Sequence, residues 1–352
     1  MAKLIDSARQ LLPSLVPSIL ALVSASFFGA LLVSAFGHSP VSVFFTMAAG
    51  AFGDAYHFSE TLLKTTPLIF TGLAVALSFR AGIWNIGAEG QFLAGALMVT
   101  AFGANSVNFF APAFFVLMIA GVFLSGAFLG IIAGWLREKH GVSEVISTIM
   151  LNVIAAQFLG YAVHGPLQEA ARTYPQSDRL AEVARLSLLW PGTRLHSGVI
   201  IALLLAIMFW LILFRRPFGF CLRVIGQNPR AAQISGINVS RHIIAALALS
   251  GGLAACGGAI EVAGVTGRLY ENISPGYGYT GIAVAMLGRL HPLGILPAAF
   301  LFGALESGAG ALQRSLGISA VLAEVIQGLV ILFVVLYRTR WFRDRLMRKA
   351  IE

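Results

Sequence analysis

The sequence predicts an all-α membrane protein that crosses the bilayer about ten times, with glycine-broken helices and an inverted five-helix repeat. Of its 352 residues, 58% are hydrophobic and only 11% are charged, less than half the share of roughly 25% that is usual in soluble domains. No charged residue lies between Arg9 and Asp54 or between Glu89 and Arg137, and such segments cannot cover a surface that faces water. These observations exclude a soluble enzyme, a nucleic-acid-binding protein and a disordered scaffold.

The helices are predicted wherever an apolar window is long enough to cross roughly 30 Å of hydrocarbon. The first window is too long for a secretion signal, so we expect an uncleaved first span and one transmembrane domain over residues 1–352. The third and eighth windows are rich in glycine, which predicts broken or re-entrant helices. The windows are residues 15–36, 61–79, 84–104, 112–135, 145–164, 198–214, 243–264, 273–290, 292–312 and 317–337.

The basic residues predict which loops face the cytoplasm, because lysine and arginine collect on that side of the membrane. With residues 1–14 inside the cell, seventeen of the 24 lysines and arginines fall on inner segments. An even number of spans returns the C-terminus to the cytoplasm, where residues 338–352 form a basic tail that we interpret as a topology anchor at the lipid headgroups. The net charge of +9 therefore indicates orientation in a membrane, with both termini cytoplasmic.

Two loops are longer than simple turns require. The outer loop, residues 165–197, mixes arginines with Glu169, Asp178 and Glu182, which suits a polar platform for a soluble partner. The alternative is a solvated loop with no partner. The inner loop, residues 215–242, contains the clearest local signals in the chain.

A short helix is predicted inside that inner loop. Asn228 can cap it through its side-chain oxygen, Pro229 fits the first helical position, and Gly236 can adopt the left-handed conformation that ends it. Such a helix is marginal alone in water, which favours another protein packing on it; the alternative is a connector that rests on its own protein. Its small, apolar and basic surface residues are Arg230, Ala231, Ala232 and Ile234.

Two glycine clusters, residues 82–91 and 274–281, interrupt the hydrophobic pattern five spans apart. An odd offset inverts the second copy relative to the first, and matched broken segments indicate a transport site between inverted repeats. Irregular backbone at membrane depth must be satisfied by protein or water, so we expect these clusters to line a cavity. The alternative is that they only let helices pack closely. The predicted substrate-pathway residues are Asn85, Glu89, Gln91, Tyr277, Tyr279 and Thr280.

The sequence offers no catalytic residues, metal ligands or cofactor motif. Glu261 and Glu306 fall near predicted outer ends of spans, and Glu324 with Gln327 could form an interhelical hydrogen-bonding pair. None of the seven histidines lies in mid-span beside a carboxylate or another histidine, so neither a proton relay nor a metal site is predicted. No lysine follows a glycine, which excludes the usual phosphate-binding loop. We therefore expect ATP to be bound by a partner subunit.

Three stretches carry a resemblance to a known family: SFRAGIWNIGAEGQFLAGAL at 78–97, GQNPRAAQISGI at 226–237, and ISPGYGYTGIAVAMLGRLHPLGILPAAFLFG at 273–303. In this order they resemble permease subunits of bacterial ABC importers in the branched-chain amino acid and simple-sugar group, specifically its nucleoside-type branch. The resemblance covers roughly residues 60–337. It implies a multi-pass protein of the bacterial cytoplasmic membrane.

The resemblance also implies partners. These are a homologous second permease, a cytoplasmic ATPase with two nucleotide-binding halves, and a periplasmic or lipid-anchored substrate-binding protein. The capped helix would enter a groove on the ATPase, and its motion would let a central cavity open outward and then inward. The residues that this assigns to ATPase coupling are Asn228, Pro229, Arg230, Ala231, Ala232 and Gly236.

The cargo and the energy source leave alternatives open. The NIGAEGQ motif favours nucleosides over simple sugars. No motif decides between a heterodimer and a homodimer of permeases. An ion-coupled secondary transporter also has inverted repeats, but the chain lacks a buried acid–base series to carry protons. The chain lacks the catalytic groups that an intramembrane enzyme would need. A structural scaffold would not need polar groups inside glycine-broken segments.

Overall fold

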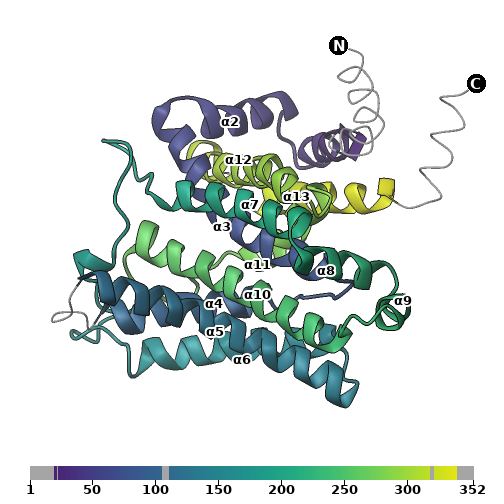
Figure 1. Ribbon diagram of the computed structural model, residues 1–352. Coiled ribbons are helices and arrows are strands. Elements are labelled where there is room, and N and C mark those ends of the chain that lie inside the picture. The colour runs from purple at the N-terminus through teal and green to yellow at the C-terminus, as the bar shows by residue number, and fades with distance from the viewer. Residues whose placement is uncertain (1–19, 22, 105–110, 318–320, 339–352) are drawn as a thin grey trace, which may run out of the picture. The chain divides into compact units, whose positions relative to one another are not determined.

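The computed structural model describes residues 20–21, 23–104, 111–317 and 321–338, and these residues are mostly helical (Figure 1). Their only β-structure is two isolated bridges, Gln176 with Tyr270 and Leu188 with His196. The all-helical prediction is confirmed. The chain divides into two compact units, Met1–Thr61 with Ala304–Glu352, and Leu62–Gly303. The N-terminal segment 1–14 and the tail from residue 339 lie outside the described residues.

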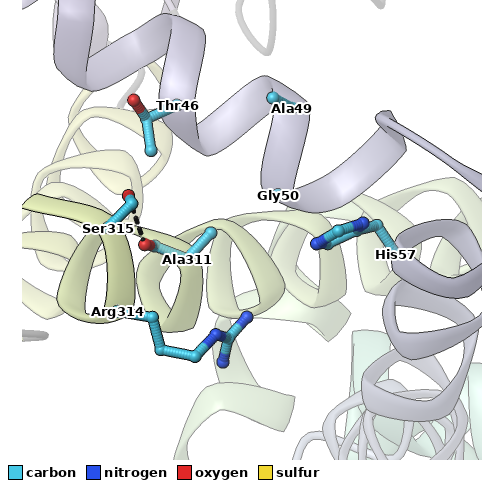
Figure 2. Close-up of a pocket in the computed structure, with 7 residues that line it drawn as sticks. All are labelled: Thr46, Ala49, Gly50, His57, Ala311, Arg314 and Ser315. Atoms are coloured by element: carbon cyan, nitrogen blue, oxygen red, sulfur yellow. Dashed lines mark hydrogen bonds between the residues drawn. The ribbon is translucent and has the colours of Figure 1, made fainter.

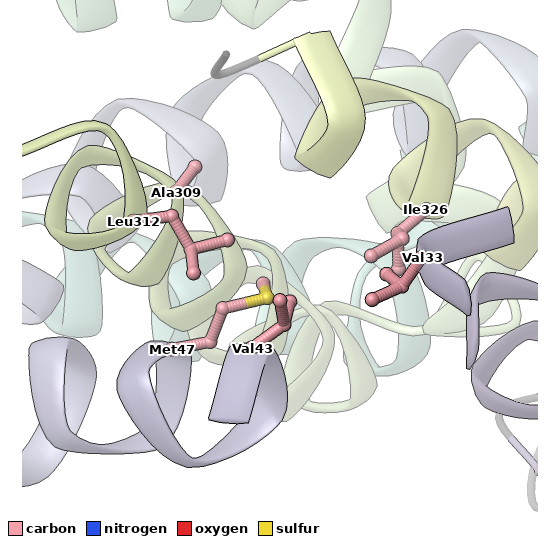
Figure 3. Packing of buried hydrophobic residues seen from close by; sticks show 6 residues of the cluster. All are labelled: Val33, Val43, Met47, Ala309, Leu312 and Ile326. Atoms are coloured by element: carbon pink, nitrogen blue, oxygen red, sulfur yellow. The ribbon is translucent and has the colours of Figure 1, made fainter. Parts of the chain in front are cut away.

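The first unit is built on a small apolar core, drawn in Figure 3. Helix Val23–Ala35 meets helix α2 at an angle of 119°, and the C-terminal helix is α13. The core residues come from these helices and from the end of α12, and they are Val33, Val43, Met47, Ala309, Leu312 and Ile326. The helices that contribute to this unit are α2 (Pro40–Phe52), the first turns of α3 (Ala55–Arg80), the end of α12 (Pro292–Leu316) and α13 (Val321–Arg338).

Helix α2 was not predicted, because residues 40–52 lie between two spans of the sequence map. Pro40 occupies the first turn, where its missing N–H costs nothing. The next helix, α3, starts after Asp54, whose Oδ1 accepts the His57 N–H at 2.7 Å. Ordinary capping signals therefore explain this part of the chain.

The second unit holds the rest of α3, the start of α12 and the helices between them. In chain order these intervening helices are α4 (Ala88–Gly103), α5 (Ala111–His140), α6 (Glu144–His164), α7 (Gly198–Arg215), α8 (Pro217–Gln227), α9 (Pro229–Ile234), α10 (Val239–Ile260) and α11 (Tyr277–Leu287). A π-helical turn, Glu261–Thr266, continues α10. Helices α4, α5 and α10 pack against one another (Figure 1).

Small residues bring the backbones of α5 and α10 into contact. A Cβ atom on Gly126 would overlap the carbonyl oxygen of Gly251, and a Cβ atom on Gly251 would overlap that of Gly126. On α4, Gly95 meets the backbone of Ala255 in the same way. Because lipid is as apolar as leucine, close packing of small residues is a main source of attraction between helices in a bilayer.

The predicted count of ten spans is not confirmed. Six helices of the described chain are long and apolar enough to cross a membrane, or seven if the bent pair 23–35 and 40–52 is one span. The third and eighth predicted spans form helices that are shorter than expected: α4 begins at Ala88 and not at residue 84, and α11 has only 11 residues. A helix of that length covers about 16 Å, too little to cross alone.

Candidate functional site

The first glycine cluster forms a turn that is held by a buried asparagine. Gly82 has φ 76°, a conformation that favours glycine. Asn85 is fully buried and donates to Gln91 Oε1 at 3.0 Å and to Ser250 Oγ at 2.8 Å. Its own Oδ1 accepts the Gly87 N–H at 2.9 Å. Asn85 therefore ties the turn before α4 to α10.

Asn152 on α6 supports the same turn, and sequence reasoning missed it. Its Oδ1 accepts the Gly90 N–H at 2.8 Å, and its Nδ2 donates to the Ile86 carbonyl at 2.9 Å. The Tyr279 hydroxyl lies 3.3 Å from the same Nδ2. The available signal was a single amide in an apolar span, because such a group needs partners at membrane depth.

The two glycine clusters meet at the starts of α4 and α11. The Gly278 N–H donates to Glu89 Oε2 at 2.7 Å, and a Cβ atom on Gly278 would overlap the backbone of Glu89. Tyr277 is buried, packs on Phe92 at 5.7 Å between ring centres, and accepts a hydrogen bond from Lys64 Nζ at 3.1 Å. Glu89 and Gly278, which are 189 positions apart in the chain, are thus joined by a hydrogen bond.

The six predicted pathway residues divide by exposure. Asn85, Glu89, Gln91 and Tyr277 are buried, and their hydrogen bonds to protein fit the packing alternative as well as the pathway. Tyr279, with 48% of its surface exposed, and the half-buried Thr280 are not fully enclosed by the described protein. Contact between any of them and a substrate stays a prediction.

The inner-loop helix forms as predicted. Asn228 Oδ1 accepts the backbone N–H groups of Arg230 and Ala231 at 3.0 and 3.1 Å, and Pro229 occupies the first helical position. Gly236 has φ 81° just after the helix. We call residues 228–236, which contain α9, the lever segment.

The lever segment has one face on its own protein and one face exposed. Ala232 is fully buried, whereas Ile234 is 89% exposed. Arg230 and Ala231 are also exposed. The prediction of a single helix in this loop was incomplete, because residues 217–227 form the amphipathic helix α8 as well.

The 165–197 loop is fastened to the turn after the π-helix. Ser177 N–H donates to the Leu269 carbonyl at 2.8 Å, and Glu169 accepts from Gln176 Nε2 at 2.7 Å and from Arg268 Nη1 at 3.1 Å. The hydrogen bond from Gln176, aided by Arg268, holds the pKa of Glu169 below its usual value of 4.5. These hydrogen bonds therefore hold the loop in a defined conformation.

A buried histidine, His196, lies at the C-terminal end of that loop. His196 Nδ1 accepts the Gly198 N–H at 3.1 Å, and its Nε2 has no hydrogen-bond partner among the described residues. Burial lowers the pKa of His196 to about 4. The ring is consequently neutral at physiological pH and fills the space over Gly264.

A separate pocket of about 290 Å³ lies in the first unit, between α2 and the end of α12 (Figure 2). His57 in this pocket is hydrogen-bonded to Asp54 at 2.8 Å. None of the predicted site residues belongs to it. Its lining residues are Thr46, Ala49, Gly50, His57, Ala311, Arg314 and Ser315.

Comparison with known proteins places this chain in a family. Residues 57–335 match the family model described as "Branched-chain amino acid transport system / permease component". Two relatives are named guanosine ABC transporter permease proteins of Bacillus subtilis: NupP is 34% identical over 92% of this chain and 93% of its own, and NupQ is 27% identical over 70% and 79%. The glucose ABC transporter permease protein TsgB13 of Haloferax volcanii is 33% identical over 90% of this chain and 86% of its own.

The matched region includes both glycine clusters, the lever segment and the 165–197 loop. It agrees with the resemblance of the three sequence motifs and with a transport subunit that is not itself an enzyme. The chain belongs to the family of permease components of branched-chain amino acid transport systems.

Proposed function

We propose that this chain is the membrane subunit of an ATP-driven importer that carries nucleosides across the bacterial cytoplasmic membrane. The family match supports the permease role, and relatives named for guanosine support the cargo. A simple sugar is the second candidate, because a relative named for glucose is similar to the same extent.

One observation carries the proposal that an outside ATPase drives this chain. The lever segment exposes Ile234 almost completely to solvent, although an isoleucine loses its favourable burial there. A helix of six residues is too short to be stable alone in water. Both facts are explained if a groove on a cytoplasmic ATPase with two nucleotide-binding halves covers Ile234 and its exposed neighbours Arg230 and Ala231.

The lever segment is also placed to transmit force. Helix α9 follows α8 directly, and Gly226 of α8 packs on the backbone of Arg80 and Ala81, next to the first glycine cluster. We infer that closure of the ATPase halves moves α8 and α9 together. That motion would shift the turn at residues 81–87 and the meeting point of α4 and α11, so that the path opens alternately to each side.

The remaining partners follow from the same proposal. Bacillus subtilis holds two relatives of this chain named for the same cargo, which supports a pair of homologous permeases. The 165–197 loop, at the opposite end of α7 from the lever segment, would face a periplasmic or lipid-anchored substrate-binding protein. We place both termini in the cytoplasm and propose ten membrane-embedded segments, of which α4 and α11 do not cross alone.

The ATPase role is tested with Ile234→Asp in the complete transporter. We expect this variant to insert in the membrane normally and to lose the ATPase during purification, because a carboxylate replaces the apolar side chain in the groove. Leu188→Asp, which alters an exposed apolar residue of the 165–197 loop, is the matched control and should retain the ATPase. Copurification of the ATPase with Ile234→Asp at the yield of the unaltered chain would refute the assignment.

The cargo is tested by uptake of labelled guanosine into cells with and without this chain. We expect uptake to depend on the chain, to resist competition by excess glucose, and to stop on ATP depletion. Competition by glucose would favour the sugar alternative. Uptake that survives ATP depletion and collapses with an uncoupler would instead identify an ion-coupled transporter.

A further inference from the structure

Three arginines lie close together near the C-terminal end of α7. Arg80, at the end of α3, lies close enough to Arg223 of α8 and to Arg289 for their charges to act on it. The Arg80 and Arg223 guanidinium carbons lie 5.5 and 5.2 Å from the centre of the same ring, Phe214. We call Arg80, Arg223 and Arg289 the arginine cluster.

The described residues supply no counter-charge for two members of this cluster. Arg80 Nε donates to the Leu290 carbonyl at 2.9 Å, and neither Arg80 nor Arg223 forms an ion pair with an acid in the described chain. Arg223 Nη1 is buried and has no acceptor there. Like charges in a partly buried site repel one another, and an unpaired buried donor costs about 1–3 kcal/mol. An anion bound at the cluster would offset the repulsion between the arginines.

The cluster lies beside a surface suited to lipid. Helix α7 has 18 residues and spans about 27 Å. At its end the Arg215 guanidinium lies 5.6 Å from the Trp210 ring, and Phe220 of α8 is 56% exposed. Aromatic and basic residues at the end of an apolar helix mark the depth of the lipid headgroups. The apolar side chains exposed along α7 include Ile200, Leu204, Ile207 and Leu211.

We propose that the arginine cluster binds the phosphate of an anionic phospholipid, whose acyl chains lie along the exposed face of α7. The planar guanidinium group matches phosphate oxygens with two parallel hydrogen bonds, and basic pockets between membrane helices are suited to acidic headgroups. A protein carboxylate is less well matched, because both guanidinium groups pack on Phe214 of the membrane helix and not on the exposed face of α9. Free phosphate would make no use of the α7 surface.

The test is native mass spectrometry of the complete transporter with phosphatidylglycerol and, for comparison, phosphatidylcholine. We expect retention of phosphatidylglycerol over phosphatidylcholine, and about tenfold weaker binding of phosphatidylglycerol in Arg223→Gln, the loss expected for a charge-assisted contact. Arg216→Gln removes an exposed arginine from the same elbow between α7 and α8 and should change binding little. Arg223→Lys keeps the charge without the two-pronged geometry, so it should fold and weaken binding by a smaller factor.

Three outcomes would overturn the proposal. Equal losses in Arg216→Gln and Arg223→Gln would show general attraction of charge and no site. Inorganic phosphate that displaces phosphatidylglycerol at equal concentration would show a free-anion site. Loss of the ATPase from Arg223→Gln with unchanged lipid binding would show that the cluster contacts protein.

Discussion

Individual side chains stabilise the conformation of both loops for which we propose partners. In the lever segment, one amide of Asn228 satisfies two N–H groups at the start of α9. In the 165–197 loop, one carboxyl group, that of Glu169, receives three hydrogen bonds. In each loop a single polar residue therefore satisfies several hydrogen-bonding groups.

Asn228→Ala should weaken ATPase binding without touching the exposed face of α9. Loss of a cap costs about 1 kcal/mol, which corresponds to about fivefold in affinity if the helix must form before it docks. The measurement is the affinity of the purified permease for the ATPase. Asn228→Asp, which also caps, should restore binding. Full binding by Asn228→Ala would show that the cap is irrelevant to docking.

Acid should loosen the 165–197 loop through Glu169. The folded-state pKa of Glu169 lies below the ordinary value of 4.5, so its contribution to stability is present above pH 4.5 and is lost as the pH falls through the lower value. We expect cleavage of the loop by an acid protease to increase over that range. Glu169→Gln should be cleaved faster even at pH 5 and should show little further change on acidification. The control Glu182→Gln should behave like the unaltered chain; if Glu169→Gln does so too, the interpretation fails.

At the scale of elements, the unit from Leu62 to Gly303 is organised around helices that touch through glycine. The α5 and α10 backbones meet at Gly126 and Gly251, and the starts of α4 and α11 meet at Gly278. These contacts leave no room for a side chain, so they hold the interrupted helices in place without an apolar layer between them.

Gly251→Ala should therefore destabilise the protein, since its new methyl group must push α10 away from α5. Overpacking of this kind costs about 1–3 kcal/mol, and it should lower the thermal unfolding midpoint in detergent. Gly328→Ala, at a helical position with nothing within 4 Å of the added carbon, should be neutral or slightly stabilising. Equal melting of the two variants would contradict the packing described for α5 and α10.

The elements that sequence could predict are those with local signals. The helix of the lever segment was predicted correctly because Asn228, Pro229 and Gly236 specify a cap, a first turn and an end within nine residues. Asn152 was missed because its partners Gly90 and Tyr279 are 62 and 127 positions away in the chain. The predicted count of ten crossings is not confirmed, because a hydropathy window does not show that the α11 helix stops after 11 residues.

At the scale of the whole molecule, the chain is a transport subunit of its permease family. Its charge pattern, its family and its exposed α9 all suit a subunit that works inside a larger assembly. Such a subunit is best studied with its partners present, because exposed apolar residues promote aggregation when they are left uncovered.

A pull-down should decide how the permeases pair. If two homologous permeases form the path, a tagged copy of this chain should recover the second permease in near-equal amount and little of an untagged copy of itself. Recovery of the untagged copy in equal amount, with the second permease also expressed, would instead indicate a homodimer. Quantitative mass spectrometry of the two untagged proteins gives the ratio.

The meeting of α4 and α11 has an electrical consequence. Helix starts carry a partial positive charge, and here the backbone N–H of Gly278 at the start of α11 donates to the carboxyl group of Glu89 in the first turn of α4. When ionised, that single carboxyl group offsets the partial charges of both helix starts, so Glu89→Gln would leave the two like partial charges uncompensated side by side.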